Sequence, residues 1–115
     1  ISHLRDPSSG CEWNKSQTSK NLLPYNLEEA EELLYAFENN DTQNFKEELG
    51  DLLLQIVLQS KIAEENDLFS FDEVIDNLCE KLIRRHPYVF KEKRSHTIEE
   101  QREAYFRIKD LEKLK

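Results

Sequence analysis

The stretch FKEELGDLLLQIVLQSKIAEE, residues 45–65, decides the fold of this chain. Its apolar residues recur at the spacing of a buried helical face: Leu49, Leu52, Leu53, Ile56, Val57 and Ala63. We therefore predict a helix over about 42–66 with one broad apolar side. Glu48 and Asp51 flank the start of the apolar run and, three residues apart, project from one side of a helix. The segment predicts a core helix that carries two carboxylates beside the core.

The remaining sequence predicts more helices and no strand. Four further helices are expected, at about 15–23 (stopped by Pro24), 26–39, 71–86 and 98–114. Residues 1–14 lack periodicity and predict an N-terminal loop, whereas 15–115 are expected to be helical. Only 2 Gly and 3 Pro leave little material for the turns of a β-rich fold. The prediction is a single all-α domain, 1–115, with a four-helix-type core. The wide apolar face of the 42–66 helix favours a homodimer.

The charge balance limits the classes of partner. The chain has 24 acidic and 16 basic residues, a net charge of −8. This excess of negative charge disfavours nucleic acid and anionic membrane surfaces as partners. No apolar run approaches the roughly 20 residues that span a bilayer. The two cysteines suggest no disulfide framework, so the expected location is a reducing cytoplasm.

Two acidic clusters have the spacing of a metal site. Glu28, Glu29 and Glu32 lie in LEEAEELL, and Glu48 and Asp51 lie in KEELGDLLLQ. If the two helices pack side by side, the carboxylates converge and repel one another unless a cation binds. Oxygen ligands favour Mg²⁺, Mn²⁺ or Ca²⁺. A ferritin-like di-iron site needs Glu-x-x-His pairs, which this chain lacks. The alternative is an ordinary acidic helix surface.

A basic stretch, KLIRRHPYVFKEKR, follows later in the chain. Lys81 and Arg85 are four residues apart on one predicted helix face, and Arg84 is adjacent. Cations near a helix C-terminus complement its dipole, which explains one or two of these charges. Arginine and lysine are also natural phosphate ligands. Metal-binding carboxylates together with such cations are what phosphoryl chemistry requires.

Four blocks of the chain resemble successive blocks of MazG nucleoside triphosphate pyrophosphohydrolases: LRDPSSGCEWNKSQT, LLPYNLEEAEELLYAFENND, FKEELGDLLLQIVLQSKIAEE and DNLCEKLIRRHPYVF. The resemblance implies an all-α, usually dimeric fold that holds Mg²⁺, with Mn²⁺ as a possible substitute. It implies hydrolysis of a nucleoside triphosphate to the monophosphate and pyrophosphate. The implied metal ligands are Glu29, Glu32, Glu48 and Asp51, and Glu28 matches the first acid of the motif.

The resemblance also implies substrate contacts. Lys81 and Arg85, with Arg84 beside them, match cations that contact phosphate. In YFRIK, Lys109 matches a substrate-contacting lysine, and Tyr105 stands where the family usually has tryptophan. Trp13 is equally able to stack on a base or to anchor the loop.

The mechanism implied is attack of water on the α-phosphorus, with Glu28 or Glu32 as the proton acceptor. Two alternatives remain open: a catalytically silent nucleotide sensor or helical interaction module of the same fold, and a pyrophosphatase with a narrow substrate such as dCTP or dUTP.

Overall fold

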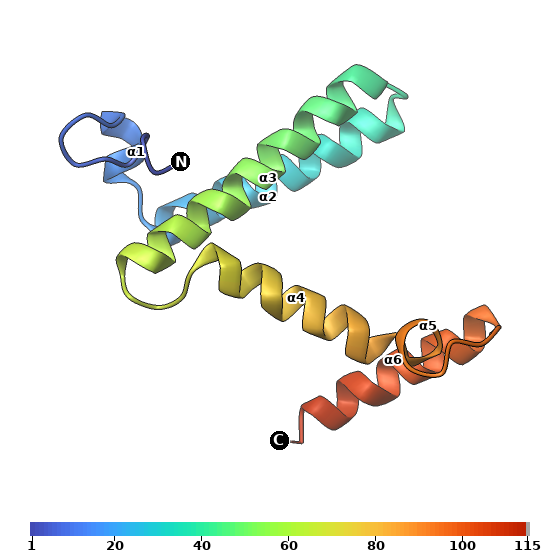
Figure 1. The fold of residues 1–115 in the computed structure, drawn as a ribbon. Helices are drawn as coiled ribbons and strands as arrows, with labels where there is room; N and C mark the ends of the chain where they lie inside the picture. Colours follow the sequence, from blue (N-terminus) through green and yellow to red (C-terminus); the bar gives the residue numbers. More distant parts are fainter. Residues whose placement is uncertain (115) are drawn as a thin grey trace. The chain divides into compact units, whose positions relative to one another are not determined.

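The computed structural model describes residues 1–114; Lys115, the last residue of the predicted domain, lies outside the described residues. The described part contains α-helices and no strand (Figure 1). The helices are α1 (Glu12–Ser16), α2 (Ser19–Glu38), α3 (Thr42–Glu65), α4 (Phe71–Arg85), α5 (Pro87–Phe90) and α6 (Ile98–Glu112). The predicted all-α class is confirmed. The chain divides into a first compact unit, Ile1–Phe71, and a second that begins at Asp72.

The pairing of α2 with α3 organises the first unit. The two helices run side by side and are joined by a short turn (Figure 1). Asn40 in this turn has a φ of 55°, a left-handed conformation that asparagine tolerates better than most residues. The side chain of Asp41 then accepts a hydrogen bond from the backbone N–H of Asn44 (3.1 Å) and caps α3. The turn therefore makes the pair antiparallel and brings the acidic segments of both helices together.

A small apolar core lies at the other end of this pair. Leu22 of α2 packs with Leu58 and Ile62 of α3, and Ile1 packs against the cluster. Leu22 and Leu58 are fully buried. The core therefore fixes the N-terminus against both helices.

The predicted helix break at Pro24 is wrong. Helix α2 begins earlier, at a capping box in which the Thr18 hydroxyl accepts from the Asn21 N–H and the Asn21 side chain accepts from the Thr18 N–H. Pro24 lies in the second turn of α2, so the one hydrogen bond it removes is to the carbonyl of Lys20, close to the helix start. The expected 15–23 and 26–39 helices are instead a short α1 and a long α2, and Asn26 lies inside α2.

The predicted N-terminal loop is a series of tight turns, and α1 begins at Glu12. The Asp6 carboxylate accepts hydrogen bonds from the Ser8 hydroxyl (2.8 Å) and from the backbone N–H groups of Ser8 and Ser9. These bonds lower the pKa of Asp6 to about 2. The loop is thus ordered by its own polar groups.

The second unit contains α5, α6 and all but the first residue of α4. The predicted start of the last helix near residue 98 is confirmed: Thr97 and Glu100 form a reciprocal capping box at the start of α6. Ala104 is the buried residue of α6, and α4 has no buried residue. Among the described helices, none has the length and apolar character needed to cross a lipid bilayer.

Candidate functional site

Three of the predicted metal ligands converge in the first unit. One carboxylate oxygen from each of Glu29, Glu48 and Asp51 lies within 4.8 Å of the other two. Glu29 projects from α2, and Glu48 and Asp51 project from adjacent turns of α3. The antiparallel pairing of α2 and α3 is therefore what brings Glu29 beside two acids that lie 19 and 22 positions later in the sequence.

Two of these carboxylates are poorly compensated. The Oε2 atoms of Glu29 and Glu48 are buried and have no hydrogen-bond partner among the described residues. The pKa of each side chain is raised, first because burial penalises the charged form. Nearby carboxylates, including Asp51, raise both pKa values further. Buried oxygens without donors, in a cluster of like charges, fit a hard divalent cation such as Mg²⁺ or Mn²⁺.

Glu32 lies against the same cluster. Its pKa is raised, chiefly by a hydrogen bond with Glu48 and then by the negative charge of that residue. Glu28 and Glu32 also line an open cavity of about 600 Å³ on the α2–α3 pair, which Glu48 borders. The two predicted proton acceptors are thus placed where a solvent molecule can reach them.

Three residues that line this cavity were not identified from the sequence: Glu31, Tyr35 and Asn44. Tyr35 lies three residues after Glu32, and Asn44 lies four residues before Glu48. Both intervals place a side chain on the same helix face as the carboxylate. Extending the carboxylate faces by one turn in each direction would have identified Tyr35 and Asn44.

The predicted phosphate-contacting arginines lie in the second unit and share one carboxylate. Arg84 Nε lies 2.7 Å from Glu112 Oε1, and Arg85 Nη2 lies 2.9 Å from Glu112 Oε2. Tyr105 contacts Arg85 in two ways: its hydroxyl accepts from Nη1 (3.2 Å), and its ring lies 5.3 Å from the guanidinium carbon. The structure thus brings Arg84, Arg85 and Tyr105 together around Glu112.

Glu112 was not identified from the sequence. A carboxylate in the last turn of a helix is unfavourable beside the negative end of the helix dipole. It also lies seven residues after Tyr105, on the same face of α6. An acid at that position predicts a cationic partner, but the sequence alone does not identify which lysine or arginine it is.

The other predicted substrate contacts are less constrained. Lys81 and Lys109 are half-buried, and their side chains make neither a hydrogen bond nor an ion pair with the described residues. Trp13 is 49% exposed, and its ring lies edge-on to Tyr25 of α2 at 6.0 Å between centroids. Trp13 therefore makes the contact expected of a loop anchor, while its stacking on a base stays a prediction.

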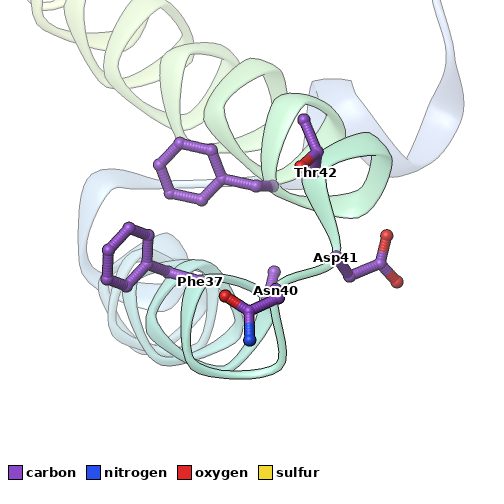
Figure 2. A pocket seen from close by; sticks show the side chains of 6 residues that line it. Phe37, Asn40, Asp41 and Thr42 are labelled. Atoms are coloured by element: carbon purple, nitrogen blue, oxygen red, sulfur yellow. The ribbon is translucent and has the colours of Figure 1, made fainter.

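A second cavity lies at the turn between α2 and α3 (Figure 2). It measures about 200 Å³ and is lined by residues 36–37, 40–42 and 45. The rings of Phe37 and Phe45 lie 5.7 Å apart there. Its one carboxylate, Asp41, already caps α3. This cavity lacks converging charged groups, so the carboxylate cluster is the stronger candidate.

Comparison with known proteins identifies the family. Residues 17–90, more than half of the chain, match the family model described as the MazG nucleotide pyrophosphohydrolase domain. The chain belongs to this family. The matched region includes the carboxylate cluster of the first unit and Lys81, Arg84 and Arg85 of the second.

Several curated relatives resemble this MazG domain. It is 51% identical over 87 residues to the nucleoside triphosphate pyrophosphohydrolase/pyrophosphatase MazG of Thermotoga maritima, covering 76% of this chain and 34% of that protein. It is 38% identical over 113 residues to an Escherichia coli nucleoside triphosphate pyrophosphohydrolase, covering 98% and 43%. It is 48% identical over 92 residues to the Bacillus subtilis protein YabN, covering 80% and 19%. The chain spans less than half the length of each.

A solved structure supports the same assignment. A mazG-related protein from Thermotoga maritima superposes with a TM-score of 0.76 and 28% sequence identity, and the match covers 87% of each chain. The predicted MazG-like fold class is therefore confirmed.

Proposed function

We propose that this MazG domain hydrolyses nucleoside triphosphates or deoxynucleoside triphosphates at the α-phosphorus and releases the monophosphate and pyrophosphate. The observation that carries the proposal is the convergence of Glu29, Glu48 and Asp51 within 4.8 Å. Family membership supports it, because two of the relatives above are named nucleoside triphosphate pyrophosphohydrolases.

The carboxylate cluster would hold Mg²⁺, with Mn²⁺ as a substitute. Glu29, Glu48 and Asp51 supply three ligands, and Glu32, against Glu48, supplies a fourth. A divalent cation bound there polarises phosphate oxygens and lowers the pKa of water. Burial, and then nearby like charges, raise the pKa of Glu29 and Glu48. A bound cation would offset both effects, because it stabilises the charged form of each carboxylate.

The remaining roles follow from chemistry and position. Glu28 and Glu32 line the open cavity, where either can accept a proton from the attacking water. Lys81, Arg84 and Arg85 supply the positive charge that the phosphates require. Tyr105 and Lys109 would contact the substrate from α6, and Trp13 would stack on its base.

A homodimer is the expected assembly. Several apolar side chains of the α2–α3 pair are more than half exposed, including Leu27 (69%), Leu34 (58%) and Leu53 (56%). Leu53 belongs to the apolar face of α3 that the sequence predicts to be buried. A second copy of the chain would cover this surface, since exposed apolar patches of this kind mark interfaces.

Product analysis tests the proposed reaction. The protein is incubated with Mg²⁺ and a panel of NTPs and dNTPs, and the products are separated by anion-exchange chromatography. We expect a monophosphate and pyrophosphate in equal amounts. Diphosphate and inorganic phosphate would mean that the attacked atom is wrongly assigned. EDTA-sensitive nucleotide binding without turnover would contradict the enzyme and favour a nucleotide sensor.

A further inference from the structure

Two arginines at the end of α4, Arg84 and Arg85, converge on a single carboxylate of α6, that of Glu112. We propose that Glu112 is a positioning residue which, together with Tyr105, holds Arg85 in a fixed orientation for the phosphates of the substrate. The proposal rests on the proposed function, in which Arg85 contacts phosphate. It gives Tyr105, for which a direct substrate contact is proposed above, the role of orienting an arginine instead.

Arg85 is held from several directions by one face of α6. Its Nε lies 3.2 Å and 3.3 Å from the two carboxylate oxygens of Glu112, and its Nη2 lies 2.9 Å from Oε2. Its Nη1 donates to the Tyr105 hydroxyl at 3.2 Å. Its main-chain carbonyl accepts from Gln101 Nε2 at 2.9 Å. Gln101, Tyr105 and Glu112 are spaced at helical intervals, so α6 fixes both the backbone and the side chain of Arg85.

These contacts leave some N–H donors of the Arg85 guanidinium unused. Arginine carries more N–H donors than the Glu112 and Tyr105 contacts use, so N–H groups on Nη1 and Nη2 remain for an anion. The Arg85 side chain is 15% exposed, so few other side-chain conformations are open to it. A guanidinium already locked in one orientation loses less conformational entropy when it binds.

Arg84 complements this arrangement. It contacts Glu112 through Nε, and its side chain is 47% exposed. Two arginines and one glutamate leave a net positive charge, so the cluster still attracts a polyphosphate. Arg85 is therefore the oriented cation of the pair and Arg84 the more mobile one.

The contact is maintained across the physiological pH range. Hydrogen bonds from Arg85 and then from Arg84 lower the pKa of Glu112 to about 2. The Glu112 carboxylate is consequently charged wherever the enzyme would operate, and the arrangement is not a pH switch.

The same geometry also allows an opposite effect, in which Glu112 competes with phosphate for the arginines. The two effects differ in sign. If Glu112 positions Arg85, its removal weakens phosphate binding; if it competes, its removal strengthens binding.

The test compares Glu112→Ala and Tyr105→Phe with Asp110→Ala. Asp110 lies in the same turn as Glu112, but its side chain is 74% exposed and lies 4.0 Å from that of Lys113. Inorganic tripolyphosphate binding with Mg²⁺ is measured by titration calorimetry, and KM and kcat are measured for the best nucleotide. Circular dichroism checks that each variant is folded.

We expect Glu112→Ala to raise the tripolyphosphate Kd and the KM by about tenfold or more, because the charged hydrogen bonds that hold Arg85 in place are lost. The kcat should fall less than the KM rises. Tyr105→Phe should change both constants in the same direction by a smaller factor, although its ring is retained. Asp110→Ala should match the parent protein.

Unchanged constants in both variants would overturn the proposal, and so would tighter binding by Glu112→Ala. If Glu112→Ala is misfolded, Tyr105→Phe decides, because it removes only a hydroxyl. If the parent protein binds tripolyphosphate but releases no pyrophosphate, the reaction fails while the Kd comparison still decides the positioning role. If the parent does not bind tripolyphosphate at all, the positioning role is wrong.

Discussion

Arg5 and Glu65, 60 residues apart in sequence, form a two-pronged ion pair in which Nε and Nη2 each lie 2.7 Å from a different carboxylate oxygen. The Arg5 side chain is only 7% exposed. Its third nitrogen, Nη1, donates to the main-chain carbonyls of Asn14 and Gln17. A single arginine thus ties the N-terminal loop and the end of α1 to the last turn of α3.

Removing this arginine should destabilise the first unit. We expect Arg5→Ala to lower the free energy of unfolding by about 2–3 kcal/mol, because it leaves two partly buried carbonyls and a partly buried carboxylate without their donor. Trp13, the single tryptophan, reports the transition through its fluorescence during urea unfolding. Lys61→Ala is the control, since its 3.9 Å pair with Glu64 is a surface pair worth less than about 1 kcal/mol. Equal losses in the two variants would contradict the role given to Arg5.

Divalent cations should stabilise the protein through the carboxylate cluster. At a Mg²⁺ or Mn²⁺ concentration 100 times the Kd, one bound ion adds about 2.7 kcal/mol to the free energy of unfolding. We expect a rise in Tm that Glu48→Gln abolishes. Glu47→Gln is the control: it removes one negative charge from the preceding residue, whose side chain is exposed, and should retain the rise in Tm. A cation effect that survives in Glu48→Gln would place the ion elsewhere.

The pH dependence of stability should differ with and without the cation. In EDTA, the raised pKa values of Glu29, Glu32 and Glu48 favour the folded state while these groups are protonated. That stability is present below their ordinary value of 4.5 and is lost as the pH rises through the raised values. The Glu112 pKa is lowered to about 2, so its contribution is lost in the opposite direction, as the pH falls from 4.5 toward 2.

Thermal melts in EDTA should therefore show a Tm that falls as the pH is raised above about 5 and also falls in strong acid. Mg²⁺ should remove the fall at high pH, and Glu48→Gln should reduce it in EDTA. Glu112→Gln should reduce only the fall in acid. The same slope above pH 5 in Glu48→Gln and the parent would show that the carboxylate cluster does not cause it.

The sequence predicts this fold well where local rules coincide with tertiary packing. Helix α3 begins at Thr42 as its periodicity predicts, because the apolar spacing and the cap at Asp41 point to the same start. The convergence of Glu29, Glu48 and Asp51 was predictable from helix spacing and one assumption, that the two helices pack side by side.

The wrong prediction at Pro24 and the missed Glu112 have a common cause: both depend on parts of the chain outside the local pattern. A proline breaks a helix when it lies deep inside one, but the capping box of α2 has its N-cap, Thr18, only six residues before Pro24. Glu112 acquires its partners only because α6 meets the end of α4, and no spacing within α6 names Arg84 or Arg85. Interactions between distant elements are what single-sequence reasoning lacks.

The two glycines should respond to alanine in opposite ways. A Cβ at Gly10 would lie 2.5 Å from the carbonyl oxygen of Leu4 and 2.7 Å from backbone atoms of Asp6, which cannot move aside as a flexible side chain would. A Cβ at Gly50, inside α3, would meet nothing within 4 Å. We expect Gly10→Ala to destabilise the protein by about 1–3 kcal/mol through overpacking. Gly50→Ala should stabilise it by up to about 1 kcal/mol, because glycine is a poor helix former.

Urea unfolding followed by Trp13 fluorescence and by circular dichroism measures both effects, and size-exclusion chromatography follows the assembly. Gly50 lies next to Leu49, which is 46% exposed on the apolar face of α3. If Gly50→Ala instead lowers stability and dissociates a dimer, a second chain approaches α3 closely at this glycine, and the gain in helix propensity is outweighed by a clash at the interface. A stabilised, still dimeric Gly50→Ala would place the interface on other parts of the exposed apolar surface.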